Sequence, residues 1–262
     1  MRRLLFLLCI AAALPAPSAR CQSMVDWFNL ARQSKDPQER IADYTKSLAA
    51  WTEADGTRNK AIVLANRGAE ETGVDQADAA LSDFNQAVAL APQLDFAYTS
   101  RGTLYWVEGK FDAALDNYSQ LIALDPKKSE PYALRAEVYQ RLGRLGAADA
   151  DLAKSIEIDP KSEESHDDLG WLRIDQGRMD DAMDELKVAA ALSPKYGDPE
   201  LGMASIELQR GREQQAREHW NKAIALEPKI LGGVRVLAKT GFTYSENGEH
   251  LIAQMLTLWK DK

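Results

Sequence analysis

A proline returns every 34 residues, and this period constrains the fold more than any other feature of the chain. The five prolines are Pro92, Pro126, Pro160, Pro194 and Pro228. A fixed period of this length indicates an array, in which each unit buries its apolar face against the next. Proline also stops a helix, because it has no backbone N–H to donate. The sequence therefore predicts five similar stacked units, each closed by a proline.

Other positions keep the same period and predict two helices in each unit. Alanine lies twelve residues before each proline and a bulky apolar residue lies eight before it, so both share one face of a helix. A small residue stands 24 before the proline, where it lets another helix approach closely. Glycine stands 17 before it in four units and suits the left-handed end of a first helix, while Asp75 takes that place in the unit ending at Pro92. We interpret these repeated positions as core packing. The alanines are Ala80, Ala114, Ala148, Ala182 and Ala216, the bulky residues are Phe84, Tyr118, Leu152, Leu186 and Trp220, the small residues are Gly68, Gly102, Ala136, Gly170 and Ala204, and the turn glycines are Gly109, Gly143, Gly177 and Gly211.

This pattern resembles the tetratricopeptide repeat family. The closest matches to the family pattern are Arg67-Gly68, Arg101-Gly102 and the segment Gly109 to Leu115. The resemblance implies an all-α, right-handed superhelical solenoid of about six helical hairpins, closed by a C-terminal pair of capping helices. It also implies a protein-binding scaffold rather than an enzyme. Within residues 58–228 the five units are expected at 61–92, 95–126, 129–160, 163–194 and 197–228.

The chain begins with a segment that is typical of a secretory signal. Arg2 and Arg3 precede the apolar stretch Leu4 to Leu14, and Ala19 offers a small residue for cleavage. We expect cleavage after residue 19, although a cut as late as 23 also fits. The apolar stretch is too short to span a bilayer, so the mature chain is expected to have no integral membrane span. The expected location is the periplasm of a bacterial cell, with lipid attachment at Cys21 or full secretion as alternatives.

Both ends of the array depart from the period. Residues 24–57 are expected to form one degenerate hairpin and a linker, with Asp36-Pro37 as the cap and first turn of its second helix. Residues 229–262 are expected to supply two capping helices, Ile230 to Lys239 and Glu249 to Lys260. The segment Ala238 to Phe242 is also faintly similar to bacterial peptidoglycan-binding modules. An alternative function is therefore a wall-associated protein that binds glycan through its C-terminal helices.

Composition excludes several classes of function. The net charge is −8, and cleavage after residue 19 leaves 30 basic against 40 acidic residues, a net charge of −10. This balance argues against nucleic acid and anionic membranes as partners. No phosphate-binding loop, nucleophile elbow or zinc-protease motif appears, so no catalytic residue, cofactor or metal is expected. The histidines His166, His219 and His250 are expected to lie on the surface. The oligomeric state is left open.

The family resemblance implies that the first helix of each unit lines a concave groove. Helical spacing places two tryptophans there, with a cluster of acids around the second. We therefore hypothesise a groove that binds a partner protein through a basic and apolar segment, with the alternative that both tryptophans fill gaps between repeats. No lysine lines these positions, and Arg67, Arg101 and Arg135 recur in a way that indicates packing and hydrogen bonding between repeats. The candidate groove residues are Asn66, Phe96, Thr103, Trp106, Glu137, Glu164, Asp167, Asp168, Trp171 and Asp175.

Overall fold

A computed structural model describes residues 23–232 and 246–259. Every regular element in these two ranges is a helix, and no strand occurs in them, as the repeat period predicted. The chain divides into two compact units, Met1–Pro92 and Gln93–Lys262, which are called the N-terminal and C-terminal units and are described separately. The expected signal segment, residues 1–19, lies outside the described residues.

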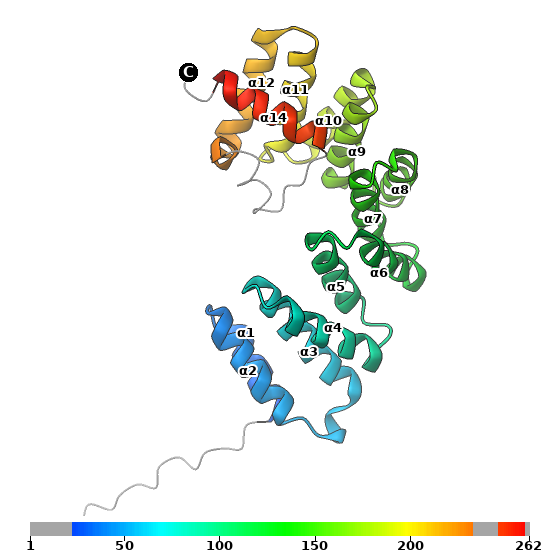
Figure 1. Cartoon of the computed structure of the whole chain (residues 1–262), viewed down its shortest axis with the longest axis vertical. Coiled ribbons are helices and arrows are strands. Elements are labelled where there is room, and N and C mark those ends of the chain that lie inside the picture. The colour runs from blue at the N-terminus through cyan, green and yellow to red at the C-terminus, as the bar shows by residue number, and fades with distance from the viewer. Residues whose placement is uncertain (1–22, 233–245, 260–262) are drawn as a thin grey trace, which may run out of the picture. The chain divides into compact units, whose positions relative to one another are not determined.

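The N-terminal unit consists of two helical hairpins (Figure 1). Asp36 caps the second helix as predicted, because its carboxylate accepts a hydrogen bond from Gln38 N at 2.9 Å and Pro37 opens the helix. Between the hairpins, the Trp51 indole donates to Gly56 O at 3.1 Å and fixes the linker. The elements are α1 Met24–Gln33, α2 Pro37–Ala49, the short η1 Glu53–Asp55, α3 Thr57–Gly73 and α4 Ala77–Leu90.

In its described residues, the C-terminal unit forms four hairpins and the helix α14 (Figure 1). Each odd-numbered helix pairs with the even-numbered helix that follows it, and the first helices α7, α9 and α11 also contact one another in order. These three first helices thus form one continuous surface. The elements are α5 Asp95–Val107, α6 Phe111–Leu124, α7 Glu130–Arg141, α8 Leu145–Ile158, α9 Glu163–Asp175, α10 Met179–Leu192, α11 Asp198–Gln209, α12 Glu213–Leu226, η2 Pro228–Gly232 and α14 Glu246–Trp259.

The turn after each first helix confirms the meaning of the periodic glycine. Gly109, Gly143, Gly177 and Gly211 have φ between 68° and 73°, the left-handed region in which glycine has no Cβ to clash. Asp75 occupies the same place in the first unit with φ 61°. Aspartate tolerates this conformation better than most residues, which explains how the unit forms without the glycine.

The small residue of each first helix makes room for the bulky residue of the second. A Cβ built on Gly102 would lie 2.7 Å from the Tyr118 ring, and one on Gly170 would lie 2.6 Å from Leu186 Cγ. Tyr118 and Leu186 are themselves buried. The two helices therefore approach more closely than any larger residue at these positions would allow.

A polar side-chain pair, here called a clasp, also joins the two helices of each of these hairpins. One member always stands nine residues before the closing proline. In the unit ending at Pro92, Arg67 donates to both carboxylate oxygens of Asp83 at 2.7 and 2.8 Å, and Arg135 binds Asp151 in the same way. Arg101 donates to Asn117 at 2.9 Å. Arg67 and Arg135 also reach the preceding hairpin at Thr45 and Ser119, which confirms the predicted hydrogen bonding between repeats.

The last two clasps use a histidine and a glutamate in opposite orders. In the hairpin of α9 and α10, His166 on the first helix contacts Glu185 on the second, with Nδ1 2.7 Å from the carboxylate. In the hairpin of α11 and α12, Glu200 is on the first helix and His219 on the second, again at 2.7 Å. His166 is buried, so the expectation of a surface histidine is wrong for this residue.

The C-terminal helix α14 packs against the first helices α9 and α11. Ile252 and Met255 are buried in a core that also contains Trp171 and Leu201. The ring of Trp259 lies 5.8 Å from that of Trp220, and Glu249 approaches Arg141 of α7 at 3.3 Å. The helix predicted at 249–260 is thus present. Of the helix predicted at 230–239, only the first three residues are described, and they lie in η2; the rest, together with all of Ala238 to Phe242, lies outside the described residues.

Candidate functional site: an acidic pocket on three first helices

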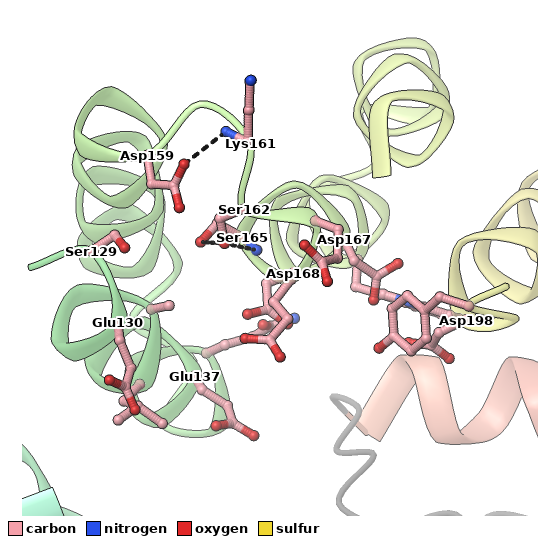
Figure 2. Close-up of a pocket in the computed structure, with 17 residues that line it drawn as sticks. Ser129, Glu130, Glu137, Asp159, Lys161, Ser162, Ser165, Asp167, Asp168 and Asp198 are labelled. Atoms are coloured by element: carbon pink, nitrogen blue, oxygen red, sulfur yellow. Dashed lines mark hydrogen bonds between the residues drawn. The ribbon is translucent and has the colours of Figure 1, made fainter. Parts of the chain in front are cut away.

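The C-terminal unit contains a pocket of about 570 Å³ on the surface formed by α7, α9 and the start of α11. Figure 2 shows its acidic side chains arriving from these separate segments around one opening. Among the described residues of the lining, Lys161 is the only basic one. Apolar and aromatic lining is supplied by Ala133, Leu134, Trp171 and Tyr196, and acidic lining by Glu130, Glu137, Asp159, Glu163, Glu164, Asp167, Asp168 and Asp198.

Helical spacing explains which side chains reach the pocket from α9. Glu164 precedes Asp167 and Asp168 by three and four residues, and Trp171 follows them by four and three, so the four side chains lie on one side of the helix. The start of α9 is fixed by Ser162, whose hydroxyl accepts from Ser165 N at 3.2 Å. The Ser165 hydroxyl in turn lies 2.8 Å from that of Ser155 on α8. These bonds set the rotation of α9 and hence the direction of its acids.

Burial and mutual repulsion disfavour the ionised forms of two pocket acids. Asp167 is 3% exposed, and its pKa is raised well above the usual range first by burial and then by the charge of Asp198. A hydrogen bond between these two carboxyl groups adds to the rise, since it needs a proton on one of them. The pKa of Asp168 is raised by burial and by Glu137 and Glu164. Burial, Asp167 and Asp198 likewise raise the pKa of Tyr196.

Asp167 differs from most of the other buried acids in the described part of the chain. The oxygen Oδ1 of Asp167 is buried and has no hydrogen-bond partner among the described residues. No ion pair joins Asp167 or Asp168 to a base within those ranges, and the charges that shift their pKa values most are acidic. Six other buried acids have a base within 4.0 Å, namely Asp43, Glu71, Asp83, Asp151, Glu200 and Glu207.

The pocket brings together half of the candidate groove residues. Glu137 from α7 meets Glu164, Asp167, Asp168 and Trp171 from α9 in its lining. Asp175 lies just outside the lining and accepts a hydrogen bond at 2.7 Å from Gln140, which is part of it.

The remaining candidate residues lie elsewhere. Phe96, Thr103 and Trp106 are on α5, outside the pocket lining. Phe96 is exposed, whereas Trp106 is half-buried. Asn66 is on α3 in the N-terminal unit, where its amide donates to Ile62 O at 2.7 Å. The structure therefore centres the site on α7 and α9.

Trp171 and Tyr196 show where helical spacing falls short. Trp171 lines the pocket but is 5% exposed, because it packs into the core beside Gly202. It therefore fills a gap between repeats, the alternative role, and is not an exposed anchor. Tyr196 was not predicted, because it precedes α11 in a connection that has no helical period. Its position two residues after Pro194, in the link between repeats, was the available clue.

The described residues contain no group of three or more His, Cys, Asp or Glu side chains that could hold a metal ion. Among the same residues, no helix has both the length and the apolar character that crossing a bilayer requires.

Comparison with known families identifies the repeat. The profile described as "TPR repeat" matches residues 108–143, and the profile described as "Tetratricopeptide repeat" matches residues 129–162. These matches include α7 and α8, and the 34-residue period extends the same pattern over five units. The chain is a tetratricopeptide repeat protein.

Solved structures of other tetratricopeptide repeat proteins share its fold. A thermophilic TPR protein of Thermus thermophilus, TTC0263, is 25% identical, with a TM-score of 0.57 over 70% of this chain and 100% of its own. A tetratricopeptide repeat protein from Parabacteroides merdae is 18% identical, with a TM-score of 0.63 over 90% and 83%. YrrB, described as having an unusual peptide-binding site, is 18% identical, with a TM-score of 0.52 over 76% and 98%. No curated protein matches the chain significantly.

Proposed function

We propose that this tetratricopeptide repeat protein is a non-catalytic scaffold that holds a segment of a partner protein against α7, α9 and α11. Proteins of this family are generally scaffolds, and their fold supports protein binding as the general function. The observation that carries the specific proposal is the acidic pocket, which lies where the first helices of three successive repeats meet.

The lining of the pocket favours a segment with basic and apolar residues. Eight acids surround the opening, so a positively charged partner is attracted and a negatively charged one is repelled. Ala133 and Leu134 on α7 give an apolar wall on which a hydrophobic side chain can pack. The net charge of −8 for the whole chain adds a long-range attraction for a positively charged partner.

We also propose that the protein acts in the cell envelope after export, in the periplasm. This proposal rests on the sequence of residues 1–19, with its two arginines, apolar stretch and small-residue site.

Site-specific crosslinking from the pocket tests the scaffold proposal. A photo-crosslinking amino acid replaces Leu134 in one protein and Val188, which is exposed on α10, in another. Both are irradiated in envelope extract, and the crosslinked peptides are identified by mass spectrometry. We expect Leu134 to crosslink one continuous segment of a partner protein and Val188 to leave that segment unlabelled. Equal labelling from both positions, or labelling from Val188 alone, would contradict the proposal.

A further inference from the structure

We infer that the acidic pocket binds the cationic end of one lysine or arginine side chain of the partner, placing the charge between Asp167 and Asp168. This inference rests on the proposed function and names the group that the site recognises. The stem of the bound side chain would lie along Leu134, and its charged end would reach the floor of the pocket.

The contrast among buried acids carries the inference. Elsewhere this chain neutralises a buried carboxylate with its own base, as Arg67 does for Asp83 with two hydrogen bonds. Asp167 is equally buried, at 3% exposure, but has no such base within the described ranges. An ionised carboxylate in such a place is costly unless a cation neutralises it. The pocket therefore contains the acid of a buried salt bridge and space for a cation, and the described residues place no cation there.

Asp167 also has the hydrogen-bonding capacity that an incoming donor needs. Its Oδ1 is buried and accepts no hydrogen bond from the described residues, while the side chain lines the pocket. A guanidinium carries five N–H donors and an ammonium carries three, so either can fill this acceptor and keep further donors for a neighbouring carboxylate. Figure 2 shows both aspartates on the same opening.

The remaining lining fits the other parts of such a side chain. Lysine and arginine have long apolar stems that pack on apolar surface while the charged end seeks polar groups. Leu134 and Ala133 offer that surface on α7. The rings of Tyr196 and Trp171 add aromatic surface close to the acids, a setting that favours a cation. The rim acids Glu137 and Glu164 add negative potential.

The arrangement couples binding to the loss of protons. The charged and titratable groups that surround the two aspartates in the described residues are Glu130 and Glu137 of α7, Asp159 after α8, Lys161, Glu163 and Glu164 at the start of α9, Tyr196 and Asp198 beside α11, and Glu227 after α12. Since burial and these acids raise the pKa values of Asp167 and Asp168, a cation must displace protons to bind. Its affinity is therefore expected to rise as the pH increases.

The test uses small probes with the full chain. N-acetyl-arginine amide and N-acetyl-lysine amide supply the two cations, and N-acetyl-citrulline amide supplies the neutral analogue of arginine. Binding is followed by NMR as shifts of the Asp167 and Asp168 amides and the Trp171 indole, at constant ionic strength. We expect saturable shifts with at least one cation, a higher affinity at higher pH, and none with citrulline amide. The two cationic probes separate a guanidinium site from an ammonium site.

Two charge-matched variants give the control. Asp168→Asn removes a pocket acid and is expected to weaken cation binding by roughly tenfold or more. Asp184→Asn removes the same charge from an exposed position on α10 and is expected to leave the affinity unchanged. Thermal unfolding of both variants verifies that each is folded. Equal weakening in both variants, or equal binding of citrulline amide and arginine amide, would overturn the inference.

The outcomes separate this inference from the proposed function. Crosslinking from Leu134 without discrimination between charged and neutral probes would leave the scaffold proposal standing and refute the cation site. If the cationic probes bind and the neutral probe does not, but no protein is crosslinked from Leu134, the scaffold proposal is refuted, and with it the partner inferred here.

Discussion

A buried carboxyl group has two different fates in this protein. Asp83 is neutralised by Arg67, which donates to both of its oxygens. Asp167 is surrounded by acids, so its ionised form is disfavoured and its pKa is raised by burial first and by Asp198 next. The first arrangement stabilises the folded state when the acid is ionised. The second stabilises it only while the acid keeps its proton.

Asp167→Asn should therefore stabilise the unliganded protein, and more at neutral than at acidic pH. The raised pKa in the folded state means that the contribution of Asp167 to stability is complete below its unfolded pKa, about 3.9, and is lost as the pH rises through its folded pKa. Asparagine does not titrate and can still donate to Asp198. Near pH 7 we expect the free energy of unfolding to increase by roughly 1–3 kcal/mol, and near pH 4 by much less. Thermal and denaturant unfolding across this pH range measures both.

The exposed Asp184→Asn serves as the control for that experiment, because its carboxylate is largely in water. A stabilisation of Asp167→Asn that is the same at both pH values would contradict the assigned pKa direction.

The sequence predicted the direction of the pocket acids but not their burial. Helical spacing places Glu164, Asp167, Asp168 and Trp171 on one face, and the structure keeps them there. Burial depends instead on residues that follow the next proline, such as Tyr196, and on how α11 packs against α9. Spacing within one helix carries no information about that contact. For the same reason the spacing did not distinguish a buried Trp171 from an exposed one.

Each hairpin depends on a close approach between its two helices. Gly102→Ala would put a Cβ 2.7 Å from the Tyr118 ring, whereas a Cβ on Gly146, in α8, would meet nothing within 4 Å. We expect Gly102→Ala to destabilise the protein by roughly 1–3 kcal/mol, because the buried ring has little room to move. Gly146→Ala should stabilise it by up to about 1 kcal/mol through helix propensity. Chemical denaturation measures the free energy of unfolding of both variants. Destabilisation of similar size in both would mean that packing against the second helix does not determine the change in stability.

The helices and turns were the most predictable part of the structure, because each depends on neighbours in the sequence. The left-handed turns at Gly109 and Asp75 follow from local geometry, and the cap at Asp36 follows from hydrogen-bonding rules. The clasps were less predictable. Recurring arginines indicated hydrogen bonding, but the pairing of His166 with Glu185 joins residues 19 apart on two helices and replaces the arginine altogether.

The C-terminal helix α14 contributes to the core of the last two hairpins through residues distant in the sequence. Ile252 is fully buried, whereas Leu258 on the same helix is 39% exposed. Ile252→Ala is expected to destabilise this region by roughly 2–5 kcal/mol, and Leu258→Ala by much less. Hydrogen exchange should show faster exchange in α9, α11 and α12 for Ile252→Ala, with α1 to α4 unchanged. Loss of protection in α1 to α4 as well would contradict a local role for α14.

The position of α14 could not be derived from the period, because the period ends at Pro228. Its apolar face predicted a helix that packs against the repeats without indicating which of them. The structure shows that it contacts α9 and α11. Such a contact depends on the path of the chain after the last repeat, which no local pattern encodes.

The opposite order of the last two clasps bears on how the hairpins find their own partners during folding. In a chain of similar units, a first helix can pair with the second helix of a neighbour and trap a misassembled state. If α11 paired with α10, Glu200 would face Glu185, two carboxylates at the place of an ion pair. If α9 paired with α12, His166 would face His219 with no acid between them. Each wrong pairing would lose its clasp, so the reversed order of histidine and glutamate disfavours pairing with the wrong neighbour.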